Sequence, residues 1–462
     1  MTNSRLISSL RQDRNFYRVL LSLMIPVVLQ QAINIGVNLM DTLMLGSFGE
    51  AQLSASSLAN SFYNIFIFIY MGVFAGCSVL SAQYWGAGKR EKVVESFSLA
   101  LRLALLFSLL FTLVTAAFPE AIMRLYTTEA DVIAYGVRYL RITAWIYMLH
   151  GCGQVMANMM RTVGKAHIGF AASAISFAVN IFANWVFIFG RLGAPRMEIA
   201  GAALGTLIAR IVELTVVLFY VFTREHDLQL KPWELLPRPG RELLYNYLRL
   251  GLAAFASDTL LGVGTSLLNT VLGRMGAAVV AANAICQLVD RLFTVVVAGV
   301  NSAASVMIGN AVGRGDREAV MRQGRVFYFL SLLIGLFCGL LVLCFGALAF
   351  RFFSLAPETH RIGHELILVY AFITVFFSMQ GTMTKGVLRG GGDTRFLLCA
   401  DILFLWVLSL PLGYIVGLLL HAPAWLTILA LRVDYIIKSF WCIHRFRSGA
   451  WIHETRSLNP EV

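Results

Sequence analysis

The stretch GAGKREKV, residues 86–93, returns as GRGDREAV at residues 313–320, and this repetition decides the fold. A shift of 227 positions pairs residues 45–93 with residues 272–320 without a gap, and 15 of these 49 pairs are identical. Shared apolar composition inflates such a match, but it does not account for the repeated glycines or the repeated Arg-Glu dipeptide. The chain therefore contains two copies of one structural unit.

Long apolar segments surround both copies. The chain has 462 residues, of which 58% are hydrophobic and 13% are charged. Apolar runs of about 20 residues recur from end to end, and each is long enough to cross a hydrocarbon core of about 30 Å as a helix. The alternation of apolar and polar residues that is typical of a membrane barrel is absent. We therefore predict an all-α integral membrane protein.

The hydropathy pattern predicts twelve transmembrane helices, six in each half. We expect them at roughly 17–46, 52–80, 93–117, 133–159, 167–190, 198–222, 245–272, 278–308, 323–349, 364–388, 395–420 and 424–444. Six is an even number, so both halves have the same topology and form two pseudo-symmetric lobes. Transporters with such repeats place their substrate between the halves, in a central cleft.

Loop charge orients the predicted helices. One set of helix ends carries 23 Lys and Arg residues and the other set carries 8, so the first set should face the cytoplasm. Both termini are then cytoplasmic in a multi-pass protein of the cell (cytoplasmic or inner) membrane. The basic segment 1–18 precedes an apolar run too long for a signal peptide, and we interpret it as a retained, amphipathic cytoplasmic segment.

One long, proline-rich loop divides the chain. We predict an N-terminal lobe at 1–222, a cytoplasmic interlobe loop at 223–244 and a C-terminal lobe at 245–462.

Several classes of function are disfavoured. The net charge of +12 is explained by loop residues that orient helices, so we expect no nucleic-acid partner. The seven cysteines form no CxxC pair, which disfavours a disulfide framework or a zinc site. No GxSxG, HExxH or Walker A sequence occurs, so we expect no enzyme activity and no cofactor besides a coupling ion. No obligate protein partner is evident.

The first span carries a polar stripe that a lipid-facing helix would not keep. Gln31, Asn34, Asn38 and Asp41 are spaced 3, 4 and 3, and on a helix they share one narrow face. In lipid, a charged aspartate alone would cost about 2.5–3.5 kcal/mol, so the stripe should face protein or a water-filled cavity. Pro26 removes a backbone hydrogen bond earlier in the span and should act as a hinge.

Asp41 is the strongest candidate for a functional residue. Acids within membrane spans are functional by default. In a site of low dielectric, Asp41 could alternate between protonated and ionised forms near neutral pH, or it could bind sodium through its hard oxygen ligands. Two amides in span five, Asn180 and Asn184, lie one turn apart and could contribute carbonyl oxygens to the same cation. The alternatives are a structural aspartate and amides that join helices.

Span seven carries a second stripe with different chemistry. Asp258 is followed by Gly262, Thr265 and Asn269 at spacings of 4, 3 and 4. At the repeat offset, the counterpart of Asp258 is Gln31 rather than Asp41. The candidates for a substrate or second-lobe site are Asp258 and Thr265, together with Gln31, Asn34 and Asn38 of the first stripe. The alternative is that Asp258 is an interhelical hydrogen-bond partner.

Other charges within the spans indicate internal pairs rather than sites. Arg210 and Glu213 are three apart and are expected to neutralise each other. Arg432 lies near Asp434, and we interpret them as an internal pair or as a side chain that reaches toward the membrane interface rather than as a site.

Six segments together resemble the multidrug and toxic compound extrusion (MATE) family over essentially the whole chain. They are IPVVLQQAINIGVNLMDTLMLG, SAQYWGAGKREK, NIFANWVFIFG, GAALGTLIAR, VLRGGGDTR and LPLGYIVG. The resemblance implies two six-helix lobes around a V-shaped cleft. It also implies export of cationic or amphipathic compounds in exchange for protons or sodium.

The resemblance also implies roles for single residues. Asp41 matches the first-helix acid that binds the coupling cation, and Pro26 matches the proline at which that helix bends. Asn180 and Thr206 match an amide and a hydroxyl of the same site, and Asp258 matches an acid of the C-terminal lobe. Two departures stand out: many relatives have Asp where this chain has Asn184, and span ten, which holds an acid in some members, has none here.

We therefore expect a cation-coupled antiporter, embedded in the lipid bilayer, that exports cationic or amphipathic drugs and toxic compounds. The alternative is a flippase or exporter of lipid-linked oligosaccharide, or of another amphipathic lipid, on a related fold. A non-transporting membrane scaffold is a third option, but it would not need the stripe from Gln31 to Asp41.

Overall fold

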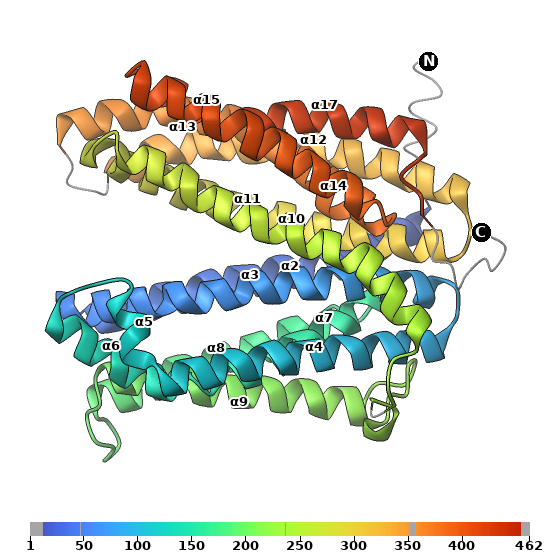
Figure 1. Ribbon diagram of the computed structural model, residues 1–462, viewed down its shortest axis with the longest axis horizontal. Coiled ribbons are helices and arrows are strands. Elements are labelled where there is room, and N and C mark those ends of the chain that lie inside the picture. Colours follow the sequence, from blue (N-terminus) through green and yellow to red (C-terminus); the bar gives the residue numbers. More distant parts are fainter. Residues whose placement is uncertain (1–12, 47, 236, 352–355, 454–462) are drawn as a thin grey trace. The chain divides into compact units, whose positions relative to one another are not determined.

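The computed structural model describes residues 13–46, 48–235, 237–351 and 356–453, with the side chain of Ala277 left out. Within these ranges the chain is almost entirely helical and contains no strand (Figure 1). The predicted all-α fold is confirmed. The predicted amphipathic segment at 1–18 falls mostly on residues 1–12, which lie outside the described residues.

The chain divides into two compact units, which are described separately below. The N-terminal unit comprises Leu29–Ser81 and Arg90–Tyr245. The C-terminal unit comprises the described residues of Met1–Val28, Ala82–Lys89 and Asn246–Val462. Helix α2 contributes its first half to the C-terminal unit and its second half to the N-terminal unit. The lobe boundaries at residues 222 and 245 stay a prediction.

The N-terminal unit is built mainly from the helices of the first half of the chain. These are α2 (Arg14–Gly46, in part), α3 (Glu50–Gly86, in part), α4 (Arg90–Ala117), α5 (Pro119–Arg124), α6 (Ala130–Thr143), α7 (Ile146–Thr162), α8 (His167–Phe189), α9 (Ile199–Thr223) and the short η1 (Pro232–Leu235). Its core gathers around the buried side chains of Met123 and Leu140.

The C-terminal unit contains the helices of the second half. These are α10 (Arg241–Gly273), α11 (Ala277–Gly313), α12 (Arg317–Arg351), α13 (Pro357–Gly381), η2 (Thr382–Leu388), α14 (Thr394–Asp401), η3 (Ile402–Ser409), α15 (Leu410–Tyr414), η4 (Ile415–Leu419), α16 (Ala424–Leu431) and α17 (Val433–Ser448). The segments η2, η3 and η4 are π-helical, a form that occurs mostly as short insertions in α-helices and frequently at functional sites. The core of this unit surrounds Cys286 and Leu366.

Ten helical stretches of the described chain are long and apolar enough to cross a membrane, and they coincide with ten of the predicted spans. The other two predicted spans are each broken into two helices. The span predicted at 133–159 consists of α6 and α7, which turn at Ala144, where the hydroxyl of Thr112 donates a hydrogen bond of 3.0 Å to the Ala144 carbonyl. The span predicted at 424–444 consists of α16 and α17, which are separated by the non-helical backbone of Arg432.

The sequence repeat is repeated in the backbone. Gly49 and Gly276 have φ angles of 110° and 116°, and Gly88 and Gly315 both have 71°. Residues other than glycine rarely adopt such positive φ values, which explains why both halves have glycine at these turns. The repeated arginine also has one role in both halves, since Arg90 and Arg317 each donate a hydrogen bond to a backbone carbonyl beyond the last helix of their own half.

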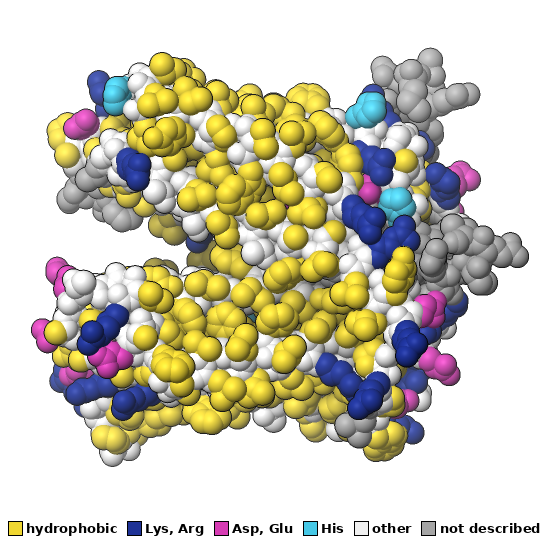
Figure 2. All heavy atoms as spheres, viewed as in Figure 1, with side chains coloured by type: hydrophobic (Ala, Val, Ile, Leu, Met, Phe, Trp, Pro, Cys, Tyr) yellow, Lys and Arg dark blue, Asp and Glu magenta, His cyan; other side chains and the backbone are white. Residues whose placement is uncertain are grey.

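The surface confirms a membrane protein. On α4, the side chains of Leu106, Leu110 and Leu113 lie on one face and are each more than half exposed, as are Leu333 and Phe337 on α12. Exposed apolar faces of this length suit lipid rather than water as the surrounding solvent. Figure 2 shows hydrophobic side chains along the middle of the helices and charged side chains gathered near the helix ends.

Candidate functional site

Helices α2, α8 and α9 bring four of the predicted site residues together in the N-terminal unit. The side-chain amide of Asn184 donates a hydrogen bond of 2.7 Å to the Asp41 carboxylate and one of 3.3 Å to the carbonyl oxygen of Asn180. Asn180 in turn donates to the hydroxyl of Thr206 at 3.4 Å. Asn180 and Asn184 are buried, and Asp41 is half-buried.

Helices α8 and α9 pack closely at this site, and a glycine on α9 leaves room for the Asn184 side chain. A Cβ atom on Gly205 would lie 2.2 Å from the side-chain oxygen of Asn184, so a larger residue would displace the amide. That oxygen is buried and has no hydrogen-bond partner. A buried acceptor without a donor is costly unless something binds to it.

The Asp41 carboxylate differs from most buried acids in its partners. Among the residues that the structure describes, no lysine, arginine or histidine forms an ion pair with Asp41. Its amide partner carries no charge, so the negative charge of an ionised Asp41 is not neutralised by a direct contact.

A small cavity adjoins the site. It offers about 20 Å³ to a water-sized molecule, which is enough room for one water. Asn34 of the predicted stripe lines the cavity together with Asn180 and Thr206. Arg210 and Glu213 line it as well and form an ion pair of 2.5 Å, which confirms the predicted pairing.

The remaining residues of the first stripe are less closely involved. Gln31 accepts a hydrogen bond of 3.2 Å from Asn34. Asn38 is exposed, and its backbone carbonyl accepts a hydrogen bond from the hydroxyl of Thr42. The stripe is therefore one face of α2, but the structure brings Asp41 and Asn34, and not Asn38, to the other site residues. Helix α2 runs without interruption through Pro26, and a hinge at that residue stays a prediction.

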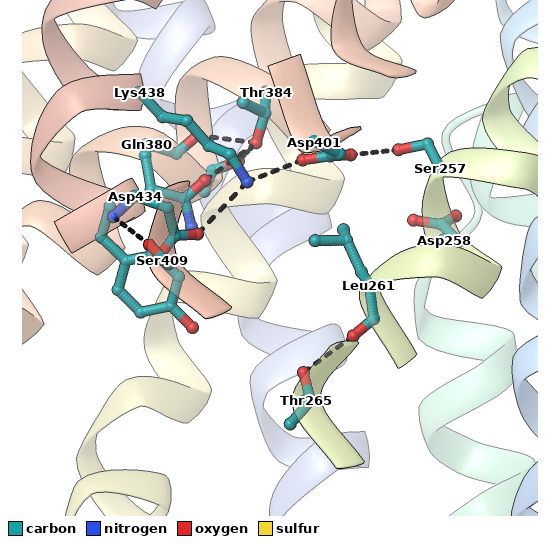
Figure 3. A network of polar contacts seen from close by, with 12 residues as sticks. Ser257, Asp258, Leu261, Thr265, Gln380, Thr384, Asp401, Ser409, Asp434 and Lys438 are labelled. Atoms are coloured by element: carbon teal, nitrogen blue, oxygen red, sulfur yellow. Dashed lines mark hydrogen bonds and ion pairs between the residues drawn. The ribbon is translucent and has the colours of Figure 1, made fainter. Parts of the chain in front are cut away.

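In the C-terminal unit, Asp258 is held in a two-point ion pair. Arg389 donates hydrogen bonds of 2.8 and 3.0 Å to the two carboxylate oxygens, and the side chains of Arg389 and Asp258 are 13% and 11% exposed. Thr265 bonds the carbonyl of Leu261 on its own helix and makes no contact with Asp258 in Figure 3. This geometry favours the interhelical role that the sequence left open for Asp258. A substrate or second-lobe site at Asp258 and Thr265 stays a prediction.

A buried ionic cluster in the same unit was missed by the sequence analysis. The ammonium group of Lys438 donates hydrogen bonds of 2.8 Å to Asp401 and 3.3 Å to Asp434 (Figure 3). Asp401 also accepts from Ser257, and Asp434 from Ser409. The side chains of Lys438 and Asp434 are 2% and 1% exposed.

Of the two alternatives for Arg432 and Asp434, the structure does not show an ion pair between them, since Asp434 is paired with Lys438. Arg432 instead donates a hydrogen bond of 2.6 Å to the hydroxyl of Tyr435. The break between α16 and α17 falls at Arg432, so this residue is not on the helical face that carries Asp434 and Lys438. The spacing of Asp434 and Lys438, four residues apart within an apolar span, was the readable signal for the true pair.

The donors of the site suit a monovalent cation. Asp41, Asn180, Asn184 and Thr206 offer carboxylate, amide and hydroxyl oxygens, which are hard ligands. Among the described residues there is no group of three or more His, Cys, Asp or Glu side chains that could hold a metal ion. A proton or a sodium ion is therefore compatible with the site, whereas a transition metal would lack its preferred ligands.

The repeated halves and their long apolar helices define a polytopic membrane protein. The MatE family model matches the chain twice, over residues 26–186 and 255–415, which also confirms the internal repeat. The chain therefore belongs to the MatE family of transporters, and the resemblance noted in the sequence is confirmed.

Similar proteins support this assignment. The chain is 24% identical to a probable multidrug resistance protein NorM from Thermotoga maritima, over 94% of this chain and 92% of that protein. It is 26% identical to the multidrug resistance protein MdtK from Yersinia pseudotuberculosis, over 87% and 88% of the two chains. A crystal structure of MATE in the bent conformation has the same fold, with a TM-score of 0.83 at 19% identity over 97% of this chain and 99% of that chain.

Proposed function

We propose that this protein is a cation-coupled antiporter that exports cationic or amphipathic compounds in exchange for protons or sodium ions. The names of the NorM and MdtK relatives support multidrug efflux. The charge distribution of the predicted loops supports a location in the cell (inner) membrane with both termini in the cytoplasm.

The observation that carries the proposal is the environment of Asp41. Its carboxylate is bonded by the amide of Asn184 and not by a base, and the oxygen of that amide is buried without a partner. A cation held by the carboxylate could satisfy both groups at once. A protonated Asp41 would instead donate its own hydrogen to a neighbouring oxygen.

The cation drives transport only if it binds one conformation more tightly than the other. In the proposed cycle, ionised Asp41 favours the state that holds the cationic compound. Entry of a proton or sodium ion from outside neutralises Asp41, α2 repacks around Pro26 and the compound leaves outward. Ordinary coupling free energies of about 1–3 kcal/mol correspond to changes of roughly 5- to 150-fold.

Efflux from proteoliposomes tests the proposal. Ethidium efflux is measured under an imposed pH gradient and, separately, under an imposed sodium gradient, for the unmodified protein, Asp41→Asn and Glu50→Gln. Glu50→Gln is the matched control because Glu50 is an exposed acid at the start of α3. We expect Asp41→Asn to lose gradient-driven efflux while it remains folded, and Glu50→Gln to keep it. Full coupled efflux by Asp41→Asn would refute the role.

A further inference from the structure

Arg210 occupies a special place in the N-terminal unit. Its guanidinium lines the cavity together with Asn180 and Thr206, which belong to the Asp41 site. One of its terminal nitrogens donates to Glu213 at 2.5 Å. Through the cavity, Arg210 lies near Asn180, which accepts a hydrogen bond from the same Asn184 amide that donates to Asp41. A single positive charge therefore contacts Glu213 and lies near the amides of the Asp41 site.

Glu213 is the anchored member of this group. One of its oxygens accepts hydrogen bonds of 3.2 Å from both Gln154 on α7 and Ser173 on α8, and the other oxygen binds Arg210. Ser173 is itself bonded by Gln30 at 3.1 Å. Glu213 is 4% exposed, and its bonds from three helices fix its position.

Arg210 has freedom that Glu213 lacks. A guanidinium carries five N–H donors, and the structure gives it a hydrogen bond to Glu213 through one nitrogen. The adjoining cavity leaves space beside the side chain. Arginine stays charged at any physiological pH, so its position, and not its protonation, is what can change.

The charges of the group add up to a demand for one cation. Ionised Asp41 and ionised Glu213 carry two negative charges, and Arg210 carries one positive charge. The other titratable groups near these residues are Tyr63 and Tyr70 on α3, Tyr139 on α6 and His150 on α7. The tyrosines are neutral at neutral pH. One bound proton or sodium ion therefore makes the three charged residues neutral.

We propose that Arg210 is an internal counter-cation of the Asp41 site. When Asp41 loses its proton or sodium ion, Arg210 moves from Glu213 toward Asp41 and offsets the exposed charge. When the cation binds again, Arg210 returns to Glu213, which is the arrangement that the structure shows. This inference rests on the proposed function and adds Arg210 and Glu213 to its site as positioning residues.

The proposal also gives Asp41 a second acid in the same unit. The direct partner of Asp41 is the uncharged Asn184, whereas the carboxylate of Glu213 lines the cavity together with Asn180 and Arg210. Arg210 would connect the charge of Glu213 to that of Asp41.

The test compares the concentration of coupling cation that gives half-maximal ethidium efflux in reconstituted variants. In Glu213→Gln, Arg210 loses its anchored partner and stays at Asp41, so it competes with the cation and the half-maximal concentration should rise. In the double variant Arg210→Gln with Glu213→Gln, the competitor is gone and the concentration should fall. We expect about tenfold in each direction.

Opposite signs separate this role from a merely structural one, because loosened packing would move both variants in the same direction. Shifts of the same sign, or no shift, would overturn the proposal. If Asp41→Asn keeps coupled efflux with an unchanged cation dependence, the proposed function itself has failed, and this outcome is distinguishable from the failure of Arg210 alone.

A stability cycle covers the case in which the double variant does not fold. Melting temperatures are measured for Asp41→Asn, Glu213→Gln and the combination of the two. If both acids share Arg210, the combination leaves a buried arginine without any acid and should lower the melting temperature by more than the sum of the single changes. Strictly additive changes would contradict a shared arginine.

Discussion

Asp41 in the N-terminal unit and the ion-paired acids of the C-terminal unit have different kinds of hydrogen-bond partner. In the N-terminal unit, Asp41 receives its hydrogen bond from the amide of Asn184. In the C-terminal unit, Asp258 is held by both ends of the Arg389 guanidinium, and Lys438 serves two further aspartates. The two halves share backbone conformations at the repeated turns, yet these acids differ in whether a base is bound directly to the carboxylate.

This difference predicts which carboxylate gains most from binding a cation. A carboxylate that is permanently paired with a buried base is close to neutral without any bound cation, so a cation gains little by binding there. A carboxylate among amides gains a full neutralising charge from a proton or sodium ion. Ion coupling is therefore expected at Asp41, and a structural role is expected for the acids of the C-terminal unit that are paired with a base. Asp290 of the C-terminal unit has no ion pair among the described residues, and its uncharged partner Thr374 makes it the natural comparison for Asp41.

Removal of Lys438 should have the largest effect on stability. Lys438→Met leaves two buried carboxylates without their shared base, and we expect a loss of about 3–5 kcal/mol in the free energy of unfolding. Thermal unfolding of the purified protein measures the change. The triple variant that also carries Asp401→Asn and Asp434→Asn should recover most of the loss, because no uncompensated charge remains. An equally unstable triple variant would show that packing, and not charge, is decisive.

The acid Asp393, outside the spans, gives a smaller, pH-dependent effect. Burial raises the pKa of Asp393, but hydrogen bonds from His453 and Arg445 and the charge of Arg445 outweigh it and hold the pKa below its usual 3.8. The ionised form is therefore the one stabilised in the folded protein. This stabilisation is present at neutral pH and is lost as the pH falls through the folded pKa.

Asp393→Asn should accordingly lower the free energy of unfolding by about 1–2 kcal/mol at pH 7. The difference from the unmodified protein should shrink as the pH falls below 3.8 and through the lower folded pKa of Asp393, and it should vanish once Asp393 is protonated in both the folded and unfolded chains. Melting temperatures across this pH range provide the measurement. A difference that is constant with pH would mean that the carboxylate charge contributes nothing.

Joint removal of the Asp258–Arg389 pair should have the smallest effect. When both partners of a buried ion pair are replaced by neutral residues, the change in stability is often close to zero. We expect Asp258→Asn with Arg389→Gln to keep its stability within about 1 kcal/mol and to retain coupled efflux. Loss of coupling in a folded double variant would place ion chemistry in the C-terminal unit and break the contrast between the units.

Most of the fold could be predicted because hydrophobic length and sequence repetition are local signals. Ten predicted spans coincide with helices, and the repeated glycines adopt the same backbone angles. The breaks within two spans could not be predicted. The break at Ala144 depends on a hydroxyl from Thr112 on another helix, and no local pattern at Ala144 or Arg432 announced it.

The site was predictable where residues share one helix and not where they meet across helices. The spacing around Asp41 and the amides of α8 singled out Asp41, Asn180 and Asn184. The resemblance to the family added Thr206. The pairing of Lys438 with Asp401 joins separate helices, and only its half with Asp434 could have been read from spacing. The ion pair between Asp258 and Arg389 could not be predicted from sequence periodicity either, because the two residues lie on different elements.

Infrared difference spectroscopy tests the central claim most directly. Spectra of the reconstituted protein are compared before and after addition of protons, and separately of sodium, for the unmodified protein, Asp41→Asn and the controls Asp258→Asn with Arg389→Gln and Asp290→Asn. Asp290 is the most demanding control because, like Asp41, its carboxylate accepts a hydrogen bond from an uncharged group, here Thr374 at 2.7 Å, and forms no ion pair among the described residues. We predict a cation-dependent carboxyl signal that disappears in Asp41→Asn and persists in both controls. A signal that survives in Asp41→Asn, or one that is lost in either control, would contradict the assignment of the coupling cation to Asp41.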